Sequence, residues 1–146
     1  MKESLNRFLE AQENQYSTAL NEIRSGSKRS HWIWYIFPQL KGLGFSSNSE
    51  YYGIKNIEEA TAYLQYPVLG LRLIEISNAL LLLKENDPGI VMGYPDDLKL
   101  KSCMTLFAAA SQTDPIFEKV LQKFFGGTTD TKTLRLLKQN DEKNKA

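Results

Sequence analysis

The feature of this sequence that most constrains its fold is a succession of apolar helix patterns separated by proline and glycine. Apolar residues recur at three- and four-residue steps over residues 4–24 and again over 67–84, and almost no segment alternates as a strand would. A chain of 146 residues, 42% of them hydrophobic, is long enough for one core without disulfides or a structural metal. We therefore predict a mainly α, single compact multi-helix domain over residues 1–138, with at most one short strand or hairpin and a frayed polar tail over 139–146.

Residues with strong backbone preferences mark where helices begin and end. Asn56, followed three residues later by Glu59, is typical of a helix start, and Pro67 suits the first turn of the next helix. Asp114-Pro115 can cap a helix that ends at Gly126-Gly127. Further elements are predicted as helices over residues 28–36, 96–110 and 132–138, a loop over 41–49 and an ambiguous short strand over 51–54.

Several classes of protein are excluded by simple counts. The chain has no apolar run of about 18 residues that could cross a membrane, and its N-terminus lacks the apolar stretch of a signal peptide. With one cysteine and one histidine, it has no internal disulfide and cannot build a zinc site from several such ligands. We expect a cytoplasmic protein with no metal, no cofactor and no membrane contact.

The net charge is close to zero, but the charges are unevenly distributed. The chain has 18 basic and 17 acidic side chains, which argues against a protein dedicated to double-stranded DNA. Residues 23–49 contain four basic side chains and no acidic one, whereas the rest of the chain has 14 basic and 17 acidic side chains. The same region holds both tryptophans and the histidine. The unusual chemistry of the chain is therefore concentrated there.

The first candidate site lies in this basic and aromatic region. On a helix over residues 28–36, one face would carry Lys28, His31 and Tyr35, with Trp34 beside them. Such a face can stack a flat ligand on its rings, hold a phosphate by its charge and change protonation near neutral pH. The alternative is that the tryptophans belong to the core and the cations to a solvated edge. The candidate ligand-binding residues here are Lys28, Arg29, His31, Trp34, Phe37 and Gln39.

A second candidate site is the polar face of the helix predicted over residues 96–110. Lys101, Ser102 and Thr105 share this face and could hold an anion, with the ammonium as a point charge and the hydroxyls as donors. The alternative is a solvated lysine with both hydroxyls bonded to backbone carbonyls. Cys103 lies on the apolar face and is expected to pack as a small hydrophobic residue.

The third candidate site is the segment that contains Glu50 and Tyr51. Glu50 is the first acidic residue after the acid-free stretch, and a carboxylate that faces a bound sugar can act as an acid, a base or a nucleophile. Tyr51 offers an aromatic ring beside it. The alternative is a surface glutamate with no role in chemistry.

Three stretches of the sequence are distinctive enough to suggest a family. They are His31-Trp32-x-Trp34-Tyr35-x-Phe37-Pro38-Gln39, Glu59-Ala60-x-x-Tyr63-Leu64-x-x-Pro67-Val68-Leu69-Gly70-x-Arg72-Leu73 and Asp96-Asp97-x-Lys99-Leu100-x-Ser102-x-Met104-Thr105-Leu106-Phe107. Together they resemble an uncharacterised bacterial family, domain of unknown function 1810, some of whose members carry the label calpastatin. The resemblance implies a mainly helical domain of unestablished activity. An inhibitor of the calpastatin kind is expected to be disordered, whereas this chain has enough apolar residues to fold.

A weaker similarity is carried by Ser49-Glu50-Tyr51-Tyr52, with Ala60, Pro67 and Gly70-x-Arg72 further along the chain. These residues are similar to positions of the NADAR family, which is linked to NAD and ADP-ribose metabolism and to cleavage of N-glycosidic bonds. Tyr51 stands where that family has a histidine, and no Trp-Gly segment occurs near the C-terminus. The similarity therefore implies ligand binding more than catalysis.

These observations lead to one functional prediction and one alternative. We predict that the three candidate segments meet at a site for a nucleotide or ADP-ribose-like small molecule, where Glu50 acts as acid or base if an N-glycosidic bond is hydrolysed. The cations of these segments would meet phosphate, and Trp34 or Phe37 would stack the base. The alternative is a non-enzymatic module that binds single-stranded RNA or a protein partner through the same surface.

Overall fold

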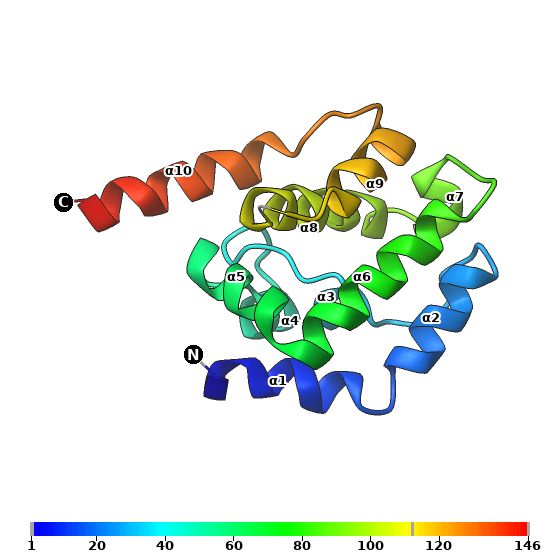
Figure 1. Cartoon of the computed structure of the whole chain (residues 1–146), viewed down its shortest axis with the longest axis horizontal. Coiled ribbons are helices and arrows are strands. Elements are labelled where there is room, and N and C mark those ends of the chain that lie inside the picture. The colour runs from blue at the N-terminus through cyan, green and yellow to red at the C-terminus, as the bar shows by residue number, and fades with distance from the viewer. Residues whose placement is uncertain (1, 112, 146) are drawn as a thin grey trace.

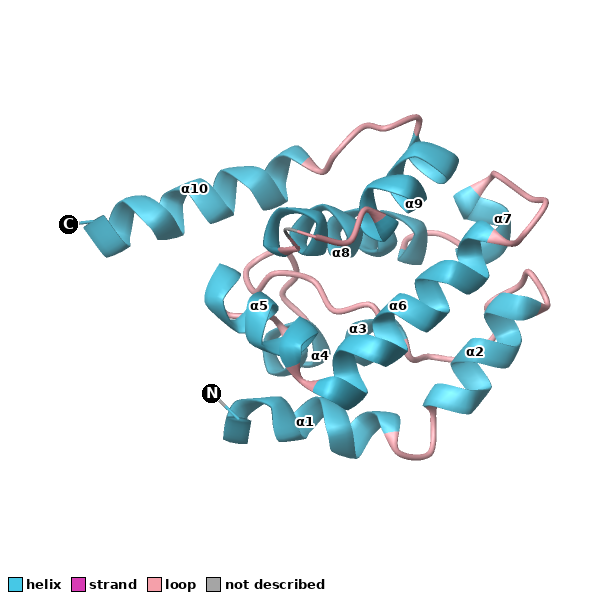
Figure 2. Cartoon of the chain, in the orientation of Figure 1, coloured by secondary structure: helices cyan, strands magenta, loops and turns pink. Residues whose placement is uncertain are grey.

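The prediction of a mainly α fold is confirmed. A computed structural model describes residues 2–111 and 113–145, and ten helices joined by loops account for most of them (Figure 2). Within these residues the β structure consists of an isolated parallel bridge between Leu40 and Ile54. None of the described helices combines the length and the apolar character that crossing a lipid bilayer requires.

The helices pack mainly around α8 and α6. Helix α8 contacts α5, α7, α9 and α10, while α6 contacts α2, α5 and α9 (Figure 1). Their bounds are α1 (Lys2–Gln12), α2 (Tyr16–Arg24), α3 (Ile33–Ile36), α4 (Ser47–Tyr52), α5 (Ile57–Gln65), α6 (Pro67–Leu81), α7 (Pro88–Met92), α8 (Asp96–Ala110), α9 (Ile116–Phe125) and α10 (Thr131–Lys145).

Local capping explains several of these helix ends. The side chains of Ser46, Asn56 and Asp87 accept backbone N–H groups in the first turns of α4, α5 and α7. Pro67 occupies the first turn of α6, as its fixed φ favours. Helix α9 ends at Gly126, whose positive φ of 62° is the left-handed conformation that glycine adopts without strain. The boundaries predicted at Asn56, Pro67 and Gly126 are therefore confirmed.

The helix predicted over residues 4–24 is in fact two helices. Helix α1 ends at Gln12. The side-chain amide nitrogen of Gln12, Nε2, donates to the carbonyl oxygen of Tyr35 and to the hydroxyl of Tyr63. Helix α1 packs against α3, whereas α2 packs against α6. The polar residues 12–15 lie where the chain bends from one partner to the other, and an apolar period alone did not reveal this bend.

Three other predicted boundaries are wrong. Residues 28–32 are not helical, since the carboxylate of Glu22 accepts backbone N–H groups of this segment. The predicted loop is confirmed over residues 41–46, but residues 47–52 form α4 in place of the end of that loop and of the start of the strand predicted over 51–54. Ile54 lies in the bridge. Helix α10 continues to Lys145 instead of ending at residue 138, and it extends past the other helices (Figure 1).

The buried aromatic and aliphatic side chains of the described residues form one cluster. The ring of Tyr63 lies 5.1 Å from that of Phe8, edge to face, and 5.3 Å from that of Phe107. Phe107 in turn lies 5.8 Å from Phe117. This chain of rings joins α1, α5, α8 and α9, and such ring pairs add to the free energy gained by burial.

Candidate functional site

Two of the predicted site residues, Glu50 and Tyr51, line a recess on the surface. The recess has a volume of about 500 Å³ and lies between α1, α4 and the segment that follows α4; we call it the α1–α4 recess. Tyr51 is 59% exposed, so its ring is accessible to a ligand. Residues that line the recess include Arg7, Lys41, Glu50, Tyr51, Gly53 and Lys55.

Helix α4 sets the positions of Glu50 and Tyr51. The hydroxyl of Ser46 accepts the N–H of Ser49 and starts the helix, so that Ser49 is buried and the next two residues are exposed. The Nζ atom of Lys41 lies 4.0 Å from Oε2 of Glu50, with about half of each side chain exposed. An exposed ion pair of this kind contributes little to stability. The carboxylate of Glu50 therefore remains accessible to a ligand.

One wall of the recess is a nearly buried ion pair. Nη2 of Arg7 donates to Oε1 of Glu59 at 2.9 Å and to the carbonyl oxygen of Gly53 at 3.0 Å. Glu59 also accepts the N–H of Lys55 and the hydroxyl of Ser4. Burial would raise the pKa of Glu59, but these hydrogen bonds and the guanidinium hold it below its ordinary value. The pair joins α1 to α5, and the charge of Arg7 is already compensated.

Backbone pairing fixes another wall. The N–H of Lys41 donates to the carbonyl oxygen of Ile54 at 2.8 Å. The N–H of Ile54 donates to the carbonyl oxygen of Gln39 at 2.9 Å. Gly53 permits this close approach, because a Cβ atom there would lie 2.7 Å from the Cα of Lys41. The side chain of Gln39, a predicted ligand contact, is nearly buried beside this bridge.

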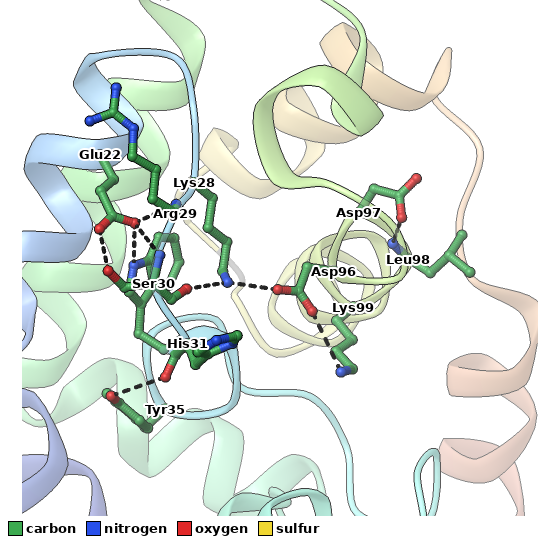
Figure 3. Close-up of polar contacts among 11 residues, drawn as sticks. Glu22, Lys28, Arg29, Ser30, His31, Tyr35, Asp96, Asp97, Leu98 and Lys99 are labelled. Carbon is green, nitrogen blue, oxygen red and sulfur yellow. Dashed lines mark hydrogen bonds and ion pairs between the residues drawn. The ribbon is translucent and has the colours of Figure 1, made fainter.

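The predicted ligand segment over residues 28–32 is held by Glu22 instead of forming a helix (Figure 3). The carboxylate of Glu22 accepts the N–H groups of Arg29 and Ser30, the hydroxyl of Ser30 and the indole N–H of Trp32. Burial would raise the pKa of Glu22, but these four hydrogen bonds lower it to about 2. Trp32 is fully buried, as the alternative reading of this segment expects.

Lys28 is engaged inside the protein. Its Nζ lies 2.7 Å from Oδ2 of Asp96 at the start of α8 and 4.8 Å from the centroid of the Trp32 ring, and its side chain is 5% exposed (Figure 3). Lys28 also donates to the carbonyl oxygen of Ser30. Its charge is therefore not free to meet a ligand phosphate, because a carboxylate 68 residues away in the sequence neutralises it.

The other predicted residues of this region do not gather at one place. Arg29 and His31 are exposed. Phe37 is fully buried and has no face on which a ligand could stack. Trp34 is partly buried, with the Nζ of Lys99 5.1 Å from its ring centroid, and its buried indole N–H finds no acceptor among the residues described.

The polar face of α8 stabilises the start of α10. The hydroxyl of Ser102 donates to the backbone carbonyl of Leu98 and to Oδ2 of Asp130. The hydroxyl of Thr105 donates to the carbonyl oxygen of Lys101 and accepts the N–H of Asp130. The ammonium of Lys101 lies 5.7 Å from the centroid of a ring on α9. Both hydroxyls are thus back-bonded, as the structural alternative expects. Cys103 is buried, and burial raises the pKa of its thiol.

The structure therefore divides the predicted site. Glu50 and Tyr51 lie together at the α1–α4 recess, whereas residues 28–32 contact the start of α8 and the second candidate site contacts the start of α10. Sequence reasoning missed Arg7, Lys41 and Lys55 as recess residues. Lys41 belongs to the acid-free stretch, but the bridge that brings it near Lys55 is made by backbone atoms and leaves no side-chain signal.

Comparison with known proteins confirms the first resemblance. The chain belongs to the family described as protein of unknown function (DUF1810), whose model matches residues 2–137. The structure is similar to that of the conserved hypothetical protein Rv1873 from Mycobacterium tuberculosis, with 45% sequence identity, a TM-score of 0.89 and coverage of 91% of this chain and 95% of that chain. No curated protein matches the chain. These comparisons do not show the weaker similarity to the NADAR family.

Proposed function

We propose that the protein binds a small nucleotide-like molecule in the α1–α4 recess. The observation that carries this proposal is the composition of the recess, where an exposed tyrosine, two exposed lysines and the accessible carboxylate of Glu50 border one space of about 500 Å³. Glu10 and the paired Arg7 and Glu59 complete its charged lining. Sites for small molecules have volumes of roughly 300–1,000 Å³ and combine an apolar surface with a few polar groups. The volume of the recess falls within this range, and its mostly polar lining offers a ring and positive charge to a nucleotide.

Tyr51 and the two lysines take the roles that the sequence assigned to other residues. Tyr51 offers its accessible ring for the base, in place of Trp34 or Phe37. Stacking of a base on an aromatic side chain contributes about 1–3 kcal/mol. Lys41 and Lys55 offer positive charge for phosphate, since both are exposed at the recess.

Glu50 is the residue that we propose as acid or base for hydrolysis of an N-glycosidic bond. As a base, its carboxylate takes a proton from water while the water oxygen bonds to the anomeric carbon of the sugar. The carbon–nitrogen bond breaks and its electron pair leaves with the nucleobase. The nucleobase then takes up the proton that Glu50 removed from water, which returns Glu50 to its carboxylate form. The half-exposed carboxylate beside Lys41 supports this role.

Isothermal titration calorimetry with ADP-ribose, AMP and adenosine tests the binding. We expect a measurable binding heat for the unmodified protein and about tenfold weaker binding for Tyr51→Ala, because the stacking surface is lost. Tyr94→Ala is the matched control, since Tyr94 is 81% exposed and does not line the recess. The absence of heat with all three compounds at millimolar concentration would overturn the proposal.

Chromatography of the free base released from a bound nucleotide tests the role of Glu50. Glu50→Gln should abolish the release and keep the binding, whereas Glu118→Gln, on α9 and outside the recess, should change neither. If the unmodified protein binds nucleotides and releases no base, hydrolysis is excluded and the protein is a binding protein.

The alternative of an RNA- or protein-binding surface requires an exposed stripe of aromatic residues. Trp32 and Phe37 lie in the core, so residues 28–39 do not present that stripe. We also propose that the protein is cytoplasmic, because a chain with one cysteine forms no internal disulfide and suits a reducing compartment.

A further inference from the structure

Lys41 and Lys55 are neighbours because of the register of the parallel bridge. Along an extended segment, successive side chains point to opposite sides, and paired residues of adjacent segments point to the same side. Leu40 and Ile54 form the bridge and point into the core, where they are 1% and 0% exposed. Lys41 and Lys55 follow them, are both exposed, and both line the α1–α4 recess. The two ammonium groups are therefore presented to the same space.

The charge of this lysine pair is poorly compensated by the protein. Among residues 4–111 and 113–143, whose side chains the structure describes, no ion pair of Lys55 is found. Lys41 reaches the carboxylate of Glu50 at 4.0 Å, the limit of such a contact. The guanidinium of Arg7, by contrast, is 2.9 Å from Glu59. Two like charges that face the same space repel each other. An anion bound between the two ammonium groups removes this repulsion.

Three carboxylates line the recess and restrict where that anion can lie. Glu59 is paired with Arg7, whereas Glu10 and Glu50 each repel a negative charge. Glu10 belongs to α1, so the favoured position is at the lysine pair and away from that wall, where the anion competes with Glu50 for Lys41. A group with two adjacent negative centres allows each ammonium to contact one centre by a charge-assisted hydrogen bond. A diphosphate has this chemistry.

We propose that Lys41 and Lys55 bind the diphosphate group of a nucleoside diphosphate or of a sugar linked through a diphosphate. The inference rests on the proposed function, because the ring of Tyr51 provides the surface for the base at the same recess. It narrows the ligand class from nucleotides in general to those with two phosphates in series.

Calorimetric titrations with adenosine, AMP and ADP test this inference. ADP should bind about tenfold more tightly than AMP, because it contacts both lysines. Lys41→Ala and Lys55→Ala should each weaken ADP binding about tenfold and leave adenosine binding unchanged. Lys84→Ala is the matched control, since Lys84 is exposed just after α6 and lies outside the recess. Circular dichroism verifies that each variant keeps its helices.

The outcomes separate this inference from the proposed function. If the three ligands bind with equal affinity, or if ADP binding survives in the double variant of Lys41 and Lys55, the diphosphate site is wrong and nucleotide binding stands. If none of the three binds while inorganic pyrophosphate binds the unmodified protein and not the double variant, the lysine site stands and nucleotide binding fails. If nothing binds, both proposals fail.

Discussion

Glu22 connects four hydrogen-bond donors on residues 29–32 to one carboxylate. One of these donors is the indole N–H of Trp32, a fully buried residue. A buried donor without an acceptor costs about 1–3 kcal/mol, and hydrogen bonds to a charged group are the stronger kind. The conformation of this loop therefore depends on the ionised form of a single side chain.

Replacing Glu22 by glutamine should lower the free energy of unfolding by about 2 kcal/mol at pH 7, because the amide nitrogen cannot accept a hydrogen bond. The pKa of Glu22 in the folded state, about 2, lies below its ordinary value of 4.5. The stabilisation by the carboxylate is therefore complete above about pH 4.5 and is lost as the pH falls toward 2. Urea unfolding from pH 7 to 2.5 measures both effects.

The control for this experiment is Glu13→Gln, which alters an exposed carboxylate in the turn after α1 and should leave the free energy of unfolding unchanged. The difference between the unmodified protein and Glu22→Gln should shrink as the pH falls below 4.5. A difference that stays constant down to pH 2.5 would show that the carboxylate is not the stabilising group.

At the scale of single residues, the sequence predicted those roles that depend on near neighbours. Asn56 caps α5 through the N–H of Glu59, three residues away. Lys28 was assigned to a ligand because its partner, Asp96, is distant in the sequence. A lysine has the same side chain whether or not a carboxylate lies beside it. Only the folded structure distinguishes a paired lysine from one that is free to bind a ligand.

At the scale of elements, Asp130 connects α10 to α8. Its carboxylate accepts the N–H and the hydroxyl of Thr133 in the first turn of α10, as well as the hydroxyl of Ser102. A carboxylate at this position satisfies free N–H groups and interacts favourably with the helix dipole. The cap joins residues that are near in the sequence, whereas the contact with α8 joins residues 28 positions apart.

Asp130→Ala should lower the stability of α10 by about 1–2 kcal/mol, because the cap and the contact with Ser102 are both lost. Amide hydrogen exchange measured by mass spectrometry should be faster in the variant than in the unmodified protein over residues 131–143. Exchange in α5 and α6 should not change. Asp130→Asn keeps an acceptor and should restore most of the protection. Equal exchange in the alanine variant and the unmodified protein would mean that packing alone holds the helix.

Helices whose ends are marked by their own residues were predicted well, whereas helices shaped by their partners were not. Helix α8 has the predicted bounds, Asp96–Ala110. The break between α1 and α2 arises because the two helices pack against α3 and α6 respectively. An apolar period reports that a face is buried and does not report which partner buries it.

At the scale of the whole molecule, Phe107 lies at the centre of the ring contacts that join α5, α8 and α9. Phe107→Ala should lower the free energy of unfolding by about 3–5 kcal/mol, since a large core side chain is lost. Phe45→Ala is the control, because Phe45 is 88% exposed and its loss should change stability by less than about 0.5 kcal/mol. Denaturant unfolding followed by circular dichroism measures the change.

A single core also predicts cooperative unfolding of the whole molecule. Tryptophan fluorescence reports on Trp32 and Trp34, while circular dichroism reports on all helices, and both signals should change at the same denaturant concentration. Two separate transitions in the Phe107→Ala variant or in the unmodified protein would contradict a core shared by α1, α5, α8 and α9.

The sequence by itself determined the mainly helical class, several helix ends and the family, because apolar periods, caps and long motifs are properties of neighbouring residues. The tertiary structure decided which cations are compensated and which groups share a recess. Lys28 is neutralised by Asp96, whereas Lys41 and Lys55 are brought together by a backbone bridge. The availability of a charge depends on the groups that surround it in space, and for these residues they come from distant parts of the chain.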